Sequence, residues 1–238
     1  MPFLLILINR FLLTFCFFLA LALPAYGLNL TMPVDRYAES MEFYYQTPRP
    51  ELITPLFRAF SEKGILANAE KRLFMAAFLA ELIKKNDLSM LHLAGEARKL
   101  NDDAILTAAW AGRLSGHNGA ILASLLNQCS PAARSQIEAS PPNLSAWKPD
   151  WEKSVLNMYW GAFMATGNSF WLDAIIDTAL AWARDTHYPT GRQAAASLYD
   201  YAPAHPMIGE RLRLRIGNAN PAEKRMLETI LEHAEAKQ

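Results

Sequence analysis

The sequence predicts an all-α protein in which about ten helices pack as antiparallel pairs in a helical-repeat, α-solenoid-like array. Apolar residues recur every three or four positions along most of the chain, which is the period of a helix buried on one side. No segment shows the sustained alternation of apolar and polar residues that is typical of a half-buried strand. Asn, Gly and Pro stand where the periodic segments begin and end, as helix boundaries favour.

The first 27 residues have the pattern of an export signal. An uninterrupted apolar run covers residues 11–23 and follows Arg10. This run suits the hydrophobic region of a secretory signal peptide and is shorter than the roughly 20 residues that cross a bilayer. Small residues near its end favour cleavage after Gly27. We therefore expect an exported protein, periplasmic or secreted, with an uncleaved membrane anchor over residues 3–23 as the alternative.

Asparagine residues mark the beginning of several expected helices. Asn68, Asn101 and Asn168 each precede a periodic segment, and an Asn side chain can accept a hydrogen bond from the first helical turn. Asn220 is followed by a proline in the favoured first position, and Asp87 begins a shorter segment. These signals predict helices over residues 68–85, 87–100, 101–115, 119–128, 151–165, 170–184, 191–202 and 206–216, with a last one from 220 towards the end of the chain.

The segment 128–150 interrupts this pattern, because it holds four prolines and at most one short turn, around residues 132–139. We expect this longest irregular segment to be a functional loop within the single helical domain that covers residues 28–238. Trp147 and Trp151 lie at its end. They are interpreted as an exposed aromatic anchor that contacts a partner or, alternatively, as staples that hold the loop to the core.

Two of the expected helix pairs look like copies of each other. When Gly116 is set on Gly167, a shift of 51 residues, Ile121 falls on Leu172. Two helices joined by a Ser/Thr-Gly turn are a typical unit of an α-solenoid. The matches are few and rich in Ala and Leu, so two ordinary antiparallel pairs remain the alternative. The spacing exceeds that of tetratricopeptide, HEAT and armadillo repeats.

A resemblance rests on the same stretch. WGAFMATGNSFWLDAII, together with AAASLYDYAPAHPMI, resembles a group of uncharacterised exported bacterial proteins built from HEAT- or tetratricopeptide-like helices. The shared features are Ala165-Thr166-Gly167 at a helix end and Ser197-Leu198 followed by His205-Pro206. The resemblance spans about residues 33–233. It implies a helical-repeat fold and an exported location, and it implies no activity, cofactor or catalytic residue.

Charge and composition exclude several classes of protein. The 238 residues carry 23 Lys and Arg against 23 Asp and Glu, so a nucleic-acid partner is not expected. Hydrophobic residues make up 52% and charged residues 19%, which excludes a disordered chain. No stretch beyond the leader could cross a membrane. Once the leader is removed, Cys129 is the only cysteine, so an internal disulfide is impossible. We favour a buried thiol, with an intermolecular bridge or a reactive thiol as alternatives.

Candidate catalytic groups are few. The chain has no HExxH, GxSxG, P-loop or dinucleotide motif, so no metal and no cofactor are expected. Asp173 and Asp177 share a helix face and form a conceivable carboxylate pair, although a solvated polar face is the better interpretation. Glu81 is a conceivable catalytic glutamate on an otherwise apolar helix. His187 and His205 flank one helix, and a turn or capping role is favoured for both.

The sequence thus favours a non-catalytic exported protein that binds a protein or peptide along one face of stacked helices. Two alternatives stay open. One is an envelope hydrolase that uses an acidic residue in a helical cleft. The other is a protein that binds a small apolar ligand between helices. A cleft with a buried carboxylate beside other polar groups would favour the hydrolase, a continuous exposed apolar groove bearing Trp147 or Trp151 would favour the scaffold, and an enclosed apolar pocket would favour the ligand binder.

Overall fold

The structure, a computed structural model, describes residues 34–148 and 153–237. The expected signal peptide and Trp151 lie outside these residues. The described residues contain twelve α-helices and no strand, apart from an isolated bridge between Ser115 and Asn143. The all-α prediction is therefore confirmed, with two helices more than the ten expected. None of these helices combines the length and the hydrophobicity that a bilayer crossing requires.

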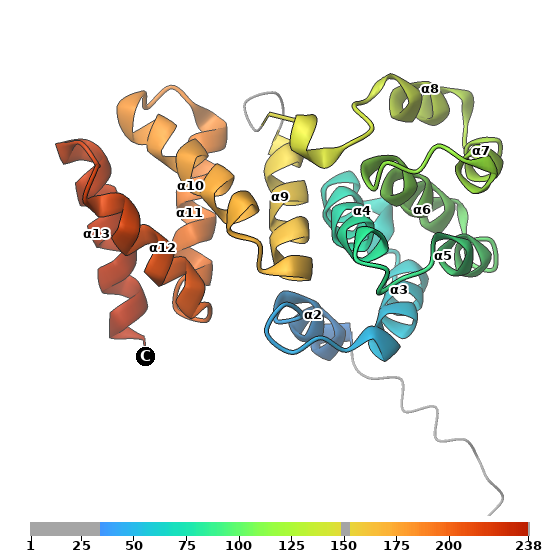
Figure 1. Cartoon of the computed structure of the whole chain (residues 1–238), viewed down its shortest axis with the longest axis horizontal. Helices are drawn as coiled ribbons and strands as arrows, with labels where there is room; N and C mark the ends of the chain where they lie inside the picture. The colour runs from blue at the N-terminus through green and yellow to red at the C-terminus, as the bar shows by residue number, and fades with distance from the viewer. Residues whose placement is uncertain (1–33, 149–152, 238) are drawn as a thin grey trace, which may run out of the picture. The chain divides into compact units, whose positions relative to one another are not determined.

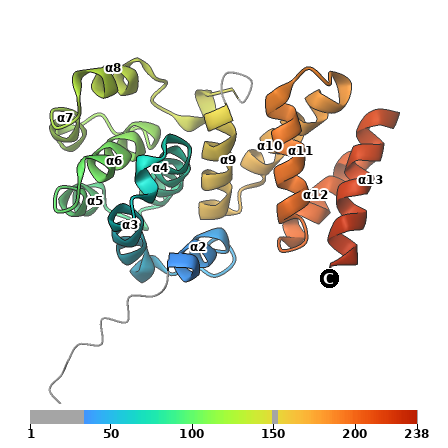
Figure 2. The same cartoon turned by 180° about the vertical axis from the view of Figure 1, so that it is seen from behind.

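Most of the helices follow one another with short connections, as Figures 1 and 2 show from opposite sides. They are α2 (Val34–Glu42), α3 (Ile53–Glu62), α4 (Ala69–Lys84), α5 (Met90–Ala97), α6 (Asp102–Leu114), α7 (Ala120–Leu126), α8 (Pro131–Ala139), α9 (Lys153–Thr166), α10 (Ser169–Arg184), α11 (Pro189–Tyr201), α12 (Pro206–Ile216) and α13 (Pro221–Ala236). Three short 3-10 helices are η1 (Pro50–Leu52), η2 (Ile65–Ala67) and η3 (Leu144–Ala146).

The predicted asparagine caps are confirmed. Asn68 accepts a hydrogen bond from the backbone of Lys71, and Asn101 and Asn168 cap α6 and α10 in the same manner. Asn220 forms a complete capping box at the start of α13. The predicted start at Asp87 is wrong, because α5 begins at Met90 behind a Ser89 cap. Helices α2 and α3 were not predicted at all.

The segment 128–150 is more regular than expected. Its first part forms α8, which Ser130 caps and Pro131 begins, and η3 follows. Arg113 of α6 fixes the junction between the two, because its guanidinium donates hydrogen bonds to the carbonyl oxygens of Glu138 and Ser140. The prediction of a long irregular loop is therefore corrected in the part of this segment that the structure describes.

Helix α4 forms the centre of the N-terminal part of the fold and packs most extensively against α9 and α6. Every residue from Met75 to Ile83 is buried. A helix that is buried on all sides over more than two turns belongs inside a core, and α4 therefore forms the centre around which its neighbours pack. Gly161 of α9 makes the close crossing possible, because a Cβ at this position would overlap the carbonyl oxygen of Phe74.

The C-terminal helices pack as α10 against α11 and as α12 against α13, with further contacts between α10 and both α12 and α13. Leu172, Ile175, Ile176 and Ala179 of α10 are buried, whereas Ala183 on the same side of the helix keeps intermediate exposure. The turns after α6 and α9 each hold a glycine with a left-handed backbone, at φ of 82° for Gly116 and 62° for Gly167. That these two helix pairs are copies of each other, stacked as units of a solenoid, stays a prediction.

Candidate functional site

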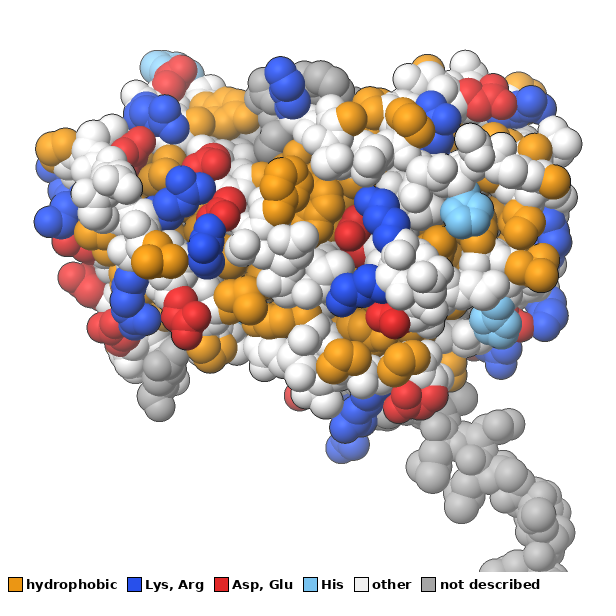
Figure 3. Space-filling model, in the orientation of Figure 1, with side chains coloured by type: hydrophobic (Ala, Val, Ile, Leu, Met, Phe, Trp, Pro, Cys, Tyr) orange, Lys and Arg blue, Asp and Glu red, His pale blue; other side chains and the backbone are white. Residues whose placement is uncertain are grey.

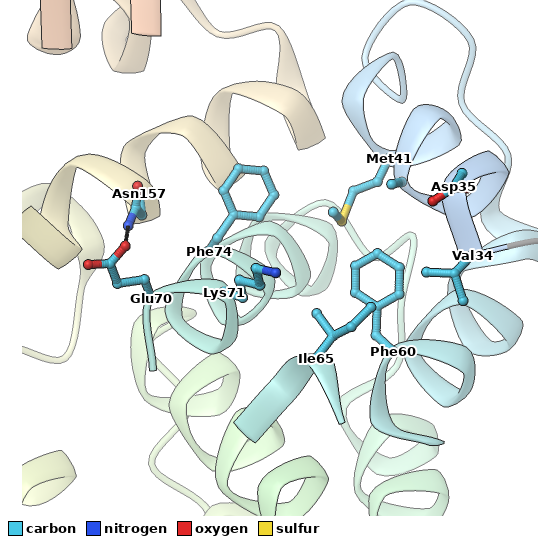
Figure 4. Close-up of a pocket in the computed structure, with 10 residues that line it drawn as sticks. Val34, Asp35, Met41, Phe60, Ile65, Glu70, Lys71, Phe74 and Asn157 are labelled. Atoms are coloured by element: carbon cyan, nitrogen blue, oxygen red, sulfur yellow. Dashed lines mark hydrogen bonds between the residues drawn. The ribbon is translucent and has the colours of Figure 1, made fainter. Parts of the chain in front are cut away.

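A pocket of about 410 Å³ lies between α2, α3, η2, α4 and α9 (Figure 4). We call it the α2–α4 pocket. Its volume falls in the range of small-ligand sites in proteins. It is lined by Val34, Asp35, Ala38 and Met41 of α2, Phe60 of α3, Ile65 of η2, Glu70, Lys71 and Phe74 of α4, and Asn157 of α9.

The helical period explains why α2 and α4 turn these side chains to the pocket. Val34, Ala38 and Met41 are spaced by four and three residues and therefore share one face of α2. Lys71 and Phe74 are related in the same way on α4. Figure 4 shows the side chains from the different elements directed towards a common space.

The wall of the pocket is apolar and is only partly shielded from solvent. Met41 and Phe60 are buried, whereas Val34, Ile65 and Phe74 keep intermediate exposure. Apolar surface that the fold leaves open in a concave site gains free energy when a ligand covers it, roughly 25 cal/mol per Å². The pocket therefore has the character of a site for an apolar group.

Polar side chains stand at the edges of the pocket. The amide of Asn157 donates a hydrogen bond to a carboxylate oxygen of Glu70 at 3.5 Å. Asp35 and Lys71 are exposed and form no ion pair with other described residues. A carboxylate and an ammonium group thus remain available to the polar end of a ligand whose apolar part fills the pocket.

The predicted aromatic anchor is only half described, because Trp151 lies outside the described residues. Trp147 is half-buried, and its indole N–H donates to the carbonyl oxygen of Pro141 at 3.3 Å. Its ring meets Trp110 edge to face at 6.1 Å, and the hydroxyl of Tyr159 donates to its backbone carbonyl. These contacts are those of a staple between the 128–150 segment and the core. A partner contact at Trp147 stays a prediction.

The predicted acidic candidates are held by cations. Glu81 is buried, and the Lys84 ammonium lies 2.7 Å from its carboxylate. Asp173 accepts hydrogen bonds from Nε and Nη2 of Arg211, and Asp177 pairs with Arg215 at 2.9 Å. The two Asp residues do share a helix face, but that face binds α12. Asp173 and Asp177 thus join α10 to α12, whereas Glu81 pairs within α4, and no described neighbour sets one of the three apart as a proton donor.

The two histidines that flank α11 do not meet. His187 is exposed and pairs with Asp185. His205 is completely buried, and its ring nitrogens contact Tyr45 and Glu42 rather than a free backbone group. Of the turn or capping role favoured for both residues, His205 keeps the position, between a turn and the start of α12, but its side chain makes no capping bond.

Cys129 is half-buried rather than fully buried, and its Sγ lies 3.5 Å from the carbonyl oxygen of Leu125. Burial, with a smaller contribution from the charge of Asp102, raises the pKa of this thiol. A raised pKa lowers the thiolate fraction, which argues against a reactive cysteine. Within residues 34–148 and 153–237, no group of three His, Cys, Asp or Glu side chains is arranged to hold a metal ion.

The chain matches no protein-family model, and no curated protein or solved structure matches it either. The site must therefore be interpreted from its own geometry. Sequence reasoning missed the α2–α4 pocket because its residues come from five elements between positions 34 and 157, and because α2 and α3 were not predicted. The closest signal was the suggestion of an apolar ligand between helices.

Proposed function

We propose that the protein is a non-catalytic, exported binding protein whose α2–α4 pocket takes the apolar part of a small ligand. The observation that carries this proposal is the pocket itself, a concave apolar space of about 410 Å³. Of the three functions that the sequence leaves open, the ligand binder comes nearest: its expected sign was an enclosed apolar pocket, and this pocket is apolar but only partly shielded from solvent. Export rests on the pattern of residues 1–27 and has no further support.

The edge of the pocket defines the ligand more closely. Apolar side chains line the interior, and Asp35 and Lys71 stand free at the edge. Both charges are solvated, so a purely hydrocarbon ligand would gain nothing from them, whereas an amphipathic ligand would pair its polar end with one of them while burying its apolar part. We therefore propose an amphipathic small molecule as the ligand class.

The surface gives less support to the protein or peptide scaffold. The most exposed large apolar side chains, Leu91, Phe170 and Leu214, lie on three different helices, α5, α10 and α12. Figure 3 shows one face on which hydrophobic patches are interrupted by charged side chains. Trp147 already uses its indole within the fold. The hydrolase has less support still, because Glu81, Asp173 and Asp177 are all paired with cations.

The test is binding of anilinonaphthalene sulfonate, an amphipathic fluorescent anion, to the folded chain from Leu28 onward. Ala38 is exposed on α2 and lines the pocket, so Ala38→Phe fills the pocket from the solvent side. Ala132→Phe adds the same ring to an exposed position of α8, away from the pocket. We expect at least tenfold weaker binding for Ala38→Phe, about 1.4 kcal/mol, and unchanged binding for Ala132→Phe.

Either of two results would overturn the proposal. The folded wild-type chain would bind none of the probe, or both variants would bind it as tightly as the wild type. Circular dichroism shows whether the variants keep their helices. Lys71→Gln measures the contribution of charge. This variant should bind the anionic probe more weakly than the wild type and should bind a neutral naphthalene probe equally well.

A further inference from the structure

His205 connects two parts of the chain that are 160 residues apart. Its Nδ1 lies 3.1 Å from the hydroxyl of Tyr45, and its Nε2 lies 3.2 Å from a carboxylate oxygen of Glu42. An ionised carboxylate only accepts hydrogen bonds, so Nε2–H donates to Glu42. In a neutral imidazole Nδ1 then accepts from the Tyr45 hydroxyl, whose oxygen accepts in turn from Gln46 at 2.8 Å. Both ring nitrogens are thus paired.

Aromatic rings enclose the same imidazole. Phe43 stacks on it with ring centroids 4.8 Å apart, and Tyr45 stacks at 5.8 Å. Tyr201 meets the ring edge to face at 5.8 Å, and Phe163 at 6.5 Å. The side chain of His205 has no solvent exposure, whereas 36% of the Glu42 side chain is exposed. The histidine is therefore the fixed member of this contact, and the segment that follows α2 is attached to it.

This attachment lies directly beside the α2–α4 pocket. Glu42 is the last residue of α2, and its neighbour Met41 lines the pocket. Tyr45, three residues further on, also donates its backbone N–H to the carbonyl oxygen of Met164 in α9. A helix of nine residues is not stable by itself in water, so the position of α2 depends on contacts of this kind. Because α2 supplies four of the lining residues, its position determines the shape of the pocket.

We propose that His205 is a positioning residue that holds α2 as a wall of the α2–α4 pocket and thereby sets the affinity of the pocket for its ligand. This inference rests on the proposed function. The histidine does not touch the ligand; it acts through Glu42 and Tyr45. If these hydrogen bonds are lost, α2 moves away from its position more often, and a ligand must pay the free energy of restoring it.

The experiment separates hydrogen bonding from packing. His205→Phe retains a ring between Phe43 and Tyr201 and removes both hydrogen bonds. Glu42→Gln retains an acceptor oxygen for Nε2–H and should bind nearly as the wild type does. His187→Phe makes the same change at an exposed histidine and serves as the matched control. We expect His205→Phe to bind anilinonaphthalene sulfonate about fivefold to tenfold more weakly, and to show faster amide hydrogen exchange in α2 with unchanged exchange in α4.

If His205→Phe fails to fold, Tyr45→Phe is the second variant, because it removes the hydrogen bond between the Tyr45 hydroxyl and His205 and keeps the ring. Faster exchange in α2 with unchanged probe affinity would overturn the inference, since α2 would then move without effect on the pocket. Unchanged exchange together with unchanged affinity would overturn it as well. If the wild type binds no probe, the proposed function and this inference both fail. If the wild type binds and Ala38→Phe does not, the proposed function stands whatever His205 does.

Discussion

Helix α4 and helix α12 are attached to their neighbouring helices in different ways. Helix α4 has a continuous buried segment from Met75 to Ile83 and crosses α9 so closely that Gly161 must have no side chain. Helix α12 buries only Ile208, Gly209 and Leu212, and ion pairs join it to its neighbours.

The C-terminal ion pairs connect three helices. Arg211 and Arg215 of α12 bind Asp173 and Asp177 of α10, while Arg213 binds Glu235 of α13. Close apolar packing is sensitive to volume, and ion pairs at the surface are sensitive to salt and contribute less. The comparison teaches that the pocket is built beside the close apolar packing of α4 against α9, with α2 attached at its edge.

The largest effect is expected for Gly161→Ala. A Cβ at this position would overlap the carbonyl oxygen of Phe74 and lie 3.2 Å from the backbone nitrogen of Phe78, so α9 and α4 must separate. Overpacking of this kind costs about 3 kcal/mol or more when backbone is the obstacle. Urea unfolding measures this loss, and binding of the probe should weaken too, because Phe74 lines the pocket.

Gly95→Ala is the matched control for this variant. Gly95 also lies within a helix, α5, and a Cβ there would meet nothing within 4 Å. Alanine should therefore raise the free energy of unfolding by about 0.5–1 kcal/mol through its helix propensity. Equal stability of the two alanine variants would show that the α4–α9 crossing is looser than the structure indicates.

A smaller effect, about 1.5 kcal/mol, is expected for Asp173→Ala in the C-terminal region, because Arg211 loses two charge-assisted hydrogen bonds. Asp177→Ala should lower the free energy of unfolding by about 0.5 kcal/mol, since 58% of the Asp177 side chain is exposed.

Unfolding at low and at high salt distinguishes the two kinds of contact. In 1 M salt, the loss of unfolding free energy caused by Asp173→Ala should shrink, whereas the loss caused by Gly161→Ala should stay the same. A salt-independent loss at Asp173 would mean that packing holds α10 to α12.

Local signals explain which parts of the fold were predictable. The caps at Asn68, Asn101, Asn168 and Asn220 depend on hydrogen bonds within three residues, so the sequence alone contains them. Helices α2 and α3 are strongly amphipathic, with their apolar residues on one face, so the sequence contained a local signal for both and this signal was overlooked. Because neither helix was among those expected, two of the elements that line the pocket were missing from the predicted fold.

The candidate site needed contacts that no local pattern contains. The shared face of Asp173 and Asp177 was visible from their spacing, but the arginines opposite them lie more than 30 residues away. His205 was visible only as a residue before a helix, and its partners Glu42 and Tyr45 precede it by about 160 residues. Long-range pairing of this kind requires the fold first.

The smallest effect on stability is expected for a substitution at Glu96 of α5. Its carboxylate forms ion pairs in the N-terminal region, so the substitution measures how much ion pairs contribute there. Hydrogen bonds from Lys99 at 2.6 Å and Arg58 at 2.7 Å lower the pKa of this carboxyl from 4.5 to about 2. A lowered pKa gives stability that is present above pH 4.5 and is lost as the pH falls towards 2. Lys99 and Arg58 are 69% and 51% exposed, so solvent screening keeps the contribution of these ion pairs to stability small.

Glu96→Gln should therefore unfold at slightly lower urea concentration than the wild type at pH 7, and this difference in the urea midpoint should vanish between pH 4.5 and 2. Glu228→Gln on α13, whose carboxylate lies 3.8 Å from Lys224, should show a smaller difference from the wild type at pH 7. A difference at Glu96 that persists at pH 2 would assign its role to packing rather than to charge.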